Sequence, residues 1–116
     1  MMATFIDRLR VFTFGNVAGG KLRNKIGISA GVSWLRHGGM ETTHLSHLYA
    51  FITLDMITAT MHASISPLGA SAVSSKCGEG HFDPKIKLGV NEDKAGIKAA
   101  EGQLSRALEL VELIHK

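Results

Sequence analysis

The sequence predicts an α/β fold in which parallel strands are flanked by helices. Two observations support this class. An apolar, strand-like run at residues 25–32 lies between two segments with helical periodicity, and a short β-branched run follows the second of these segments. Strands that alternate with helices are typical of doubly wound α/β sheets. At 116 residues, the chain is expected to form a single domain over residues 1–116.

The first expected element is a helix at residues 4–12. Phe5, Leu9 and Phe12 fall on one stripe, and Thr4 is an acceptable N-cap. A glycine-containing connection follows, and residues 25–32 (KIGISAGV) then form the first strand. The second half of this run does not alternate, which is typical of strands that helices cover on both faces.

A second helix is expected at residues 41–56, after the loop SWLRHGG. Glu41 lies in its first turn, where the helix dipole favours a carboxylate. Residues 57–61 (ITATM) are β-branched enough for a short strand. The predicted core stripe of this helix consists of Leu45, Leu48, Tyr49, Ile52 and Met56.

The segment 62–90 is rich in glycine and serine and is expected to be mostly loop, with a short extended piece at residues 70–74. The last helix is expected at residues 92–115, with Asn91 or Asp93 as its cap. Its predicted core stripe follows the helical period and consists of Ile97, Ala100, Leu104, Ala107, Leu108, Val111 and Ile114.

This predicted sheet has too few strands. The run 25–32 needs a neighbour on each edge, but only 57–61 and the weaker piece 70–74 are available. An uncovered apolar strand edge invites pairing with another chain. We therefore predict that the protein is a homo-oligomer through the exposed edge of strand 25–32, or a fragment of a larger fold.

Composition and charge exclude several classes. With 45% apolar and 20% charged residues, the chain has an ordinary globular composition, and no apolar run approaches the ~20 residues that span a bilayer. The N-terminus mixes charges with apolar residues, unlike a signal peptide, so a cytoplasmic location is expected. The net charge of +3 is scattered and the aromatic residues are few, which argues against nucleic-acid binding.

Metal and nucleophile chemistry receive little support. Cys77 is the only cysteine, so one chain can form neither an internal disulfide nor a cysteine-ligated cluster. Cys77 and His81 lack further ligands at sensible spacing. Glu41, His44 and His47 have the spacing of half a di-metal motif, but such sites need the motif twice. We predict no metal site and a surface-exposed histidine pair.

Three segments resemble NADPH-dependent FMN reductases and iron–sulfur flavoproteins. They are FIDR at residues 5–8, the stretch 22–57, which contains RHGGMETT at residues 36–43, and the tail at residues 91–114, which is similar to the family's last helix. The string RHGGMETT is similar to the family's loop between the fourth strand and the next helix, with Met40 in place of the usual glutamine. The resemblance implies a partial flavodoxin-like, three-layer fold. The family's N-terminal half, with its phosphate loop and cysteine motif, has no counterpart here.

For the site, the resemblance implies FMN as the cofactor. A loop after a parallel strand lies where open α/β sheets bind ligands, and paired glycines let the backbone approach a flat ring. The residues expected to contact the flavin are Ser33, Trp34, Arg36, His37, Gly38, Gly39 and Thr42. Without a phosphate loop, the isolated chain is expected to bind FMN weakly or not at all. The alternative is a tight turn at the glycines beside a packed Trp34.

The implied activity is electron transfer or NAD(P)H-dependent reduction of FMN, with NAD(P)H or ferredoxin as the donor. No catalytic acid or base is assigned, because the flavin performs the chemistry. The alternative is a truncated, non-catalytic homologue, which oligomerises or pairs with a chain that supplies the N-terminal half.

Overall fold

One extended segment, residues 25–33, lies at the centre of the fold, and we call it the central segment. The computed structural model describes residues 2–8, 20–35, 38–60, 67–75 and 90–116. Within the segment lie β1 (Ile26–Gly27) and β2 (Ala30–Ser33). β1 pairs in parallel with β3 (Ile57–Thr58), and β2 pairs in parallel with β4 (Ala70–Val73). The protein is therefore a mixed α/β fold with short parallel strand pairs, as the sequence predicted in general terms.

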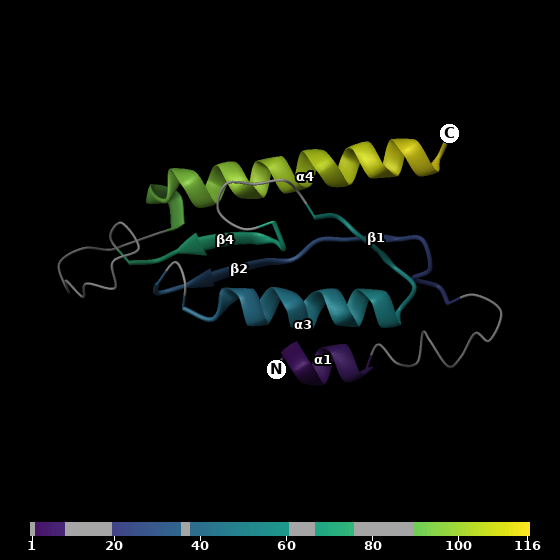
Figure 1. Ribbon diagram of the computed structural model, residues 1–116, viewed down its shortest axis with the longest axis horizontal. Coiled ribbons are helices and arrows are strands. Elements are labelled where there is room, and N and C mark those ends of the chain that lie inside the picture. The colour runs from purple at the N-terminus through teal and green to yellow at the C-terminus, as the bar shows by residue number, and fades with distance from the viewer. Residues whose placement is uncertain (1, 9–19, 36–37, 61–66, 76–89) are drawn as a thin grey trace.

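Helices lie on opposite sides of these strands. α3 (Met40–Thr53) packs on β2 and β3, and α4 (Lys94–Ile114) packs on β4 and β1. Figure 1 shows α4 on one side of the strands, with α3 on the other and the short α1 (Met2–Arg8) beyond α3. A single 3₁₀ turn, η2 (Val90–Glu92), leads into α4.

β3 and β4 follow one another along the same edge of the central segment, as two parts of one interrupted strand. The amide of Ala59, just after β3, donates to the carbonyl of Gly27 at 2.9 Å, and the amide of Ala70 donates to that of Ser29 at 2.9 Å. These two carbonyls are successive acceptors on one edge of the central segment. Ala70 thus takes the ladder position two residues beyond Ala59, although ten residues separate them in the sequence.

The buried side chain of Gln103, on α4, closes this break. Its Oε1 accepts a hydrogen bond from the amide of Ala70 at 3.0 Å, and its Nε2 donates to the carbonyl of Ala59 at 3.1 Å. At 1% exposure, Gln103 is one of the least accessible side chains in the described residues. A buried side-chain amide with both ends hydrogen-bonded in this way joins the end of β3 to the start of β4 and gives the carbonyl of Ala59 a donor.

Small residues let both helices approach the strands closely. A Cβ at Gly31 would lie 2.1 Å from Met40 Cε, and a Cβ at Gly96, in α4, would lie 2.9 Å from the Cα of Ala72. Asp93 anchors the start of α4: its carboxylate accepts from the amide of Gly96 at 3.1 Å and from the amide of Val73, at the end of β4, at 2.9 Å. Asp93 was one of the two predicted caps.

Several predicted boundaries were wrong in detail. The strand expected at 25–32 is interrupted between β1 and β2, and the one expected at 57–61 is ordered as strand only over β3. The second helix ends at Thr53 rather than residue 56, because Asp55 has a left-handed φ of 55°. The extended piece expected at 70–74 is confirmed as β4. The first helix starts at Met2, and residues 9–12 of its predicted span lie outside the described part.

The predicted core stripes of both long helices were wrong. In α3, Leu48 is buried as predicted, but Leu45, Tyr49 and Ile52 are exposed, and Met40 and His44 are buried with Leu48. In α4, Leu104 and Leu108 are exposed, while Gly96, Ala99 and Gln103 face the strands. The strands present small side chains, so the helices meet them through small residues and the large apolar side chains project beside the contact.

Candidate functional site

The loop singled out by the sequence lies at the carboxyl end of β2. Ser33 ends the strand, and its carbonyl accepts hydrogen bonds from the amide of Ser74 at 2.9 Å and from the hydroxyl of Ser74 at 3.3 Å. The hydroxyl of Ser75 donates to the carbonyl of Trp34. The carboxyl ends of β2 and β4 are therefore joined by hydrogen bonds, and polar side chains from both strands lie at this end of the pair.

Gly39 opens α3 from this loop. It is the N-cap, with a left-handed φ of 89°, and no side chain caps the helix there. No described atom lies within 4 Å of a Cβ built on Gly39, so φ rather than crowding favours glycine. The first amides of a helix have no partner within the helix, so this N-terminus presents hydrogen-bond donors next to the loop.

The remaining predicted contact residues fall into three groups. Trp34 is 41% exposed and is therefore not packed in a core. The amide of Gly38 donates to the carbonyl of Leu35 at 3.2 Å, and Thr42 is exposed on the first turn of α3. Arg36 and His37 lie outside the described residues. The structure thus places Ser33, Trp34, Gly38, Gly39 and Thr42 in one region, at the end of β2 and the start of α3.

A chain of hydrogen bonds links α3 to Ser29, just before β2, and to Ser71 in β4. Ser29 Oγ lies 2.7 Å from His44 Nδ1 and 2.8 Å from His47 Nδ1. On the other side of the ring, His44 Nε2 lies 2.8 Å from Ser71 Oγ. The single hydroxyl proton of Ser29 can be donated to only one of the two rings, so Ser29 accepts from the other. The four groups therefore form a continuous hydrogen-bonded chain between Ser71 and His47, and the histidine tautomers set the direction in which it donates.

This cluster corrects the expectation of a surface-exposed histidine pair. The side chain of His44 is fully buried, and that of His47 is half-buried. Burial lowers the pKa of His44 below its ordinary value, nearby His47 lowers this pKa further, and Glu41 raises it. The sequence signal was available in part: His44 lies four residues after the buried Met40, on the same face of the helix. Ser29 and Ser71 carried no such signal.

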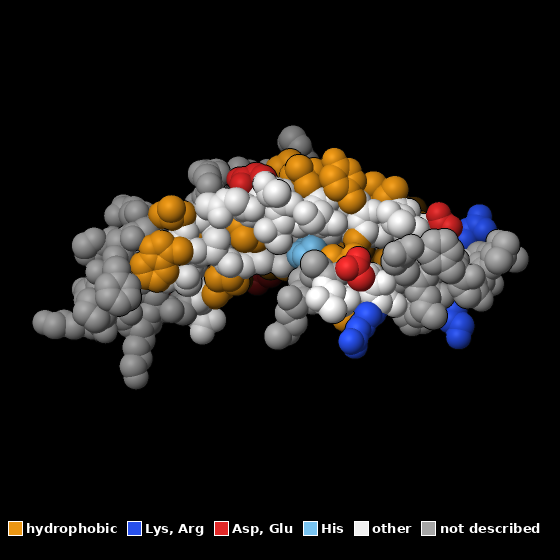
Figure 2. All heavy atoms as spheres, turned by 90° about the horizontal axis from the view of Figure 1, so that it is seen from below, with side chains coloured by type: hydrophobic (Ala, Val, Ile, Leu, Met, Phe, Trp, Pro, Cys, Tyr) orange, Lys and Arg blue, Asp and Glu red, His pale blue; other side chains and the backbone are white. Residues whose placement is uncertain are grey.

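A cavity of about 410 Å³ lies beside the same cluster. Its walls are almost entirely apolar and include Phe5 and Ile6 of α1, Ile28 and Ala30 of the central segment, and His47 and Phe51 of α3; Leu22, Leu54 and Met56, which lie outside these elements, complete them together with Ala50. Figure 2 looks at this side of the molecule and shows one histidine with hydrophobic side chains and an acidic side chain near it. Cavities of this size accommodate small ligands or buried side chains.

Two features are absent from the described part of the chain: a metal-binding cluster and a membrane-spanning helix. There, no three histidine, cysteine, aspartate or glutamate side chains come together in a way that could hold a metal ion. Cys77 and His81 fall outside that part. No helix in the described ranges is both long and apolar enough to cross a membrane.

Comparisons with known proteins add no relative. The chain matches no protein-family model, no curated protein and no solved structure.

Proposed function

We propose that this chain is a relative of the flavodoxin-like FMN reductases and iron–sulfur flavoproteins, and that residues 33–43 contact the flavin ring. One observation carries this proposal. The loop between β2 and α3 combines an exposed Trp34, a left-handed Gly39 and uncapped helix amides at the carboxyl end of a parallel strand. Ligands of open α/β sheets bind at such ends.

The described residues of this loop suit the ring of a flavin. Trp34 offers an aromatic face, and the first amides of α3 are donors suited to the polar edge of an isoalloxazine. Arg36, which could pair with an anionic group, lies outside the described residues. A bound flavin would supply the redox chemistry, with NAD(P)H or ferredoxin as the proposed donor, while the protein would orient the ring and supply hydrogen bonds.

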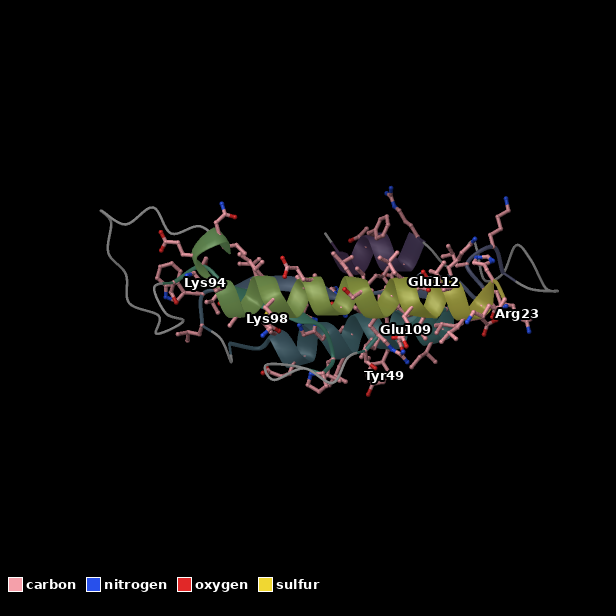
Figure 3. All side chains as sticks on the ribbon, turned by 90° about the horizontal axis from the view of Figure 1, so that it is seen from above. Arg23, Tyr49, Lys94, Lys98, Glu109 and Glu112 are labelled. Carbon is pink, nitrogen blue, oxygen red and sulfur yellow. The ribbon has the colours of Figure 1, made fainter. Side chains whose placement is uncertain are left out.

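Flavin titration tests this proposal directly. The purified chain is titrated with FMN and, separately, with riboflavin, which has the same ring but no phosphate; flavin fluorescence is recorded. We expect weak binding of both with similar affinity, because the described contacts serve the ring. Trp34→Ala should weaken both at least several-fold. Tyr49→Ala is the matched control, because Tyr49 is an exposed aromatic residue of α3 that points away from the strands (Figure 3). Unchanged fluorescence with either flavin would contradict the proposal.

A second function is favoured by a different observation. Among the described strands, none pairs with the outer edge of β1 and β2, and each sheet has two strands. Such an edge supports a non-catalytic role, in which the chain oligomerises through residues 25–32 or pairs with a chain that supplies further strands. Light scattering on the sample used for the flavin titration separates the two roles. A colourless assembly that binds no flavin favours pairing alone.

A further inference from the structure

The hydrogen-bonded chain between Ser71 and His47 can donate in either of two directions. Ser71 Oγ lies 2.8 Å from His44 Nε2, at one end of the chain. Ser29 Oγ lies 2.7 Å from His44 Nδ1 and 2.8 Å from His47 Nδ1. A neutral imidazole has one N–H and one acceptor nitrogen, so the position of the proton on one group fixes the protons on the next.

The hydroxyl of Ser71 favours one direction. If it donates to His44 Nε2, every hydroxyl proton in the chain has an acceptor. If His44 Nε2–H donates to Ser71 instead, the proton of Ser71 needs a second acceptor. Ser71 is 3% exposed, and within the described part of the chain the only hydrogen-bond partner of its hydroxyl is His44. Because a buried hydroxyl without an acceptor is costly, Ser71 donates.

The ring of His44 passes this direction on. It is fully buried and closely packed: a Cβ at Gly69 would lie 2.5 Å from His44 Nδ1 and 2.6 Å from the carbonyl oxygen of Ser29. Burial lowers the pKa of His44, so its ring is neutral at pH 8 and carries a single N–H. Since Nε2 accepts from Ser71, the proton is on Nδ1 and is donated to Ser29.

The other end of the chain is the half-buried His47. Ser29 accepts from His44 Nδ1, so its own proton is donated to His47 Nδ1. The proton of the neutral His47 ring is therefore on Nε2. Among the described residues, Ser29 is the one hydrogen-bond partner of His47. The group that His47 has left to offer a ligand is thus a donor, Nε2–H, and not an acceptor.

His47 is also part of the wall of the apolar cavity between α1, the central segment and α3. Of the described side chains in this wall, His47 alone carries an N–H or O–H group, and none is an acid, a lysine or an arginine. A charged ligand would lose its hydration there without gaining an opposite charge. An apolar wall with one donor therefore suits an uncharged molecule with one acceptor.

We propose that this cavity binds a small, uncharged, mainly apolar molecule whose single carbonyl group accepts a hydrogen bond from His47 Nε2–H. The cavity volume of about 410 Å³ lies in the range of small-molecule sites, in which few polar groups fix the orientation of the ligand. His47 lies about two helical turns beyond Gly39, so the site is separate from the proposed flavin contact. The inference goes beyond both functions proposed above and depends on neither.

The tautomers of the two histidines are tested first, without a ligand. The full chain is labelled with ¹⁵N-histidine, and long-range ¹H–¹⁵N correlations at pH 8 identify the protonated nitrogen of each neutral ring. We expect the proton of His44 on Nδ1 and that of His47 on Nε2. The reverse pair of tautomers would overturn the inference, because His47 would then present an acceptor to the cavity.

Two ligands of nearly the same shape then test the donor. Acetophenone has a carbonyl group, and α-methylstyrene has a CH₂ group in place of the carbonyl oxygen. Each is titrated into the full chain, and NMR shifts of Ile6, Ile28 and Phe51 report binding in the cavity. We expect acetophenone to bind about three- to tenfold more tightly, the usual effect of one neutral hydrogen bond, and to be alone in shifting His47 Nε2. Equal affinities, or binding of neither ligand, would overturn the inference.

A pair of variants assigns the preference to His47. His47→Phe keeps an aromatic ring without an N–H, so it should bind both ligands equally. His115→Phe makes the same exchange at an exposed position in the C-terminus and should keep the preference for acetophenone. A preference that survived in His47→Phe would contradict the inference. The tautomers and the ligand comparison need no variant, so they remain decisive even if His47→Phe does not fold.

Discussion

The buried histidine of α3 makes stability depend on pH. His44 hydrogen-bonds to Ser29 and Ser71 and has no access to solvent. Burial, followed by the influence of His47, lowers its pKa in the folded state. In the unfolded chain, the imidazole regains its ordinary pKa near 6.5 and binds a proton more readily. Acid therefore favours unfolding.

We expect the contribution of His44 to the free energy of unfolding to be nearly constant above pH 6.5. It should fall as the pH drops below 6.5, by up to about 1.4 kcal/mol per pH unit, until the lowered folded-state pKa is reached. Urea unfolding at pH 8, 7, 6 and 5 measures this slope. His44→Gln should flatten it, whereas His115→Gln, at the exposed C-terminus, should not. An equal slope in wild type and His44→Gln would refute the assignment.

This cluster also shows where sequence reasoning stops. The loop at Gly38 and Gly39 was placed correctly between a strand and a helix, because glycines after an apolar run signal a turn at a known distance. His44 was misplaced, because its burial depends on two serines, 15 residues before it and 27 after it. Such a contact arises only when the strands are paired, and a helical pattern in one segment does not contain it.

Among the elements, the break between β3 and β4 is the most demanding feature. The carbonyl of Ala59 and the amide of Ala70 meet at this buried position, and Gln103 hydrogen-bonds to both from α4. We expect Gln103→Leu to lower the free energy of unfolding by about 1–3 kcal/mol, because the carbonyl of Ala59 would be left buried without this donor. Urea denaturation measures the change.

The matched control for Gln103→Leu is Ser105→Ala. Ser105 lies on the exposed side of α4, and its hydroxyl bonds only to the carbonyl of Glu101 one turn earlier. Its replacement should change stability by no more than about 0.5 kcal/mol. If Gln103→Leu and Ser105→Ala had the same stability, Gln103 would not stabilise the junction between β3 and β4.

The helix stripes were mispredicted for a related reason. Hydrophobic periodicity identifies a helix face by the size of its apolar side chains, and in α4 that face contains Leu104 and Leu108. The strands below it present Ala70 and Ala72, so the close contact is made through Gly96 and Ala99. The existence and length of α4 follow from its sequence, but its orientation follows from the small residues of a distant strand.

At the scale of the whole molecule, burial among the described strands is concentrated on one strand, β4. All four residues of β4 are buried, whereas Val32 of its partner β2 is 54% exposed. β4 is the element to which α4 and the His44 cluster both attach, through Asp93, Gln103 and Ser71. The outer edge of β2 and the exposed leucines of α4 have no such cover among the described residues.

Native-state hydrogen exchange should reproduce this asymmetry. The slowest amides are expected in β4 and in the first half of α4, where exchange requires global unfolding, because β4 is fully buried and this half of α4 packs on it. The outward amides of β2 and those of α1 are expected to exchange by local opening, at least a hundredfold faster. Exchange rates measured by NMR on the isolated chain test this order. Equal protection on both edges of β2 would mean that the outer edge is already covered, and that the chain reaches a complete sheet without a partner strand.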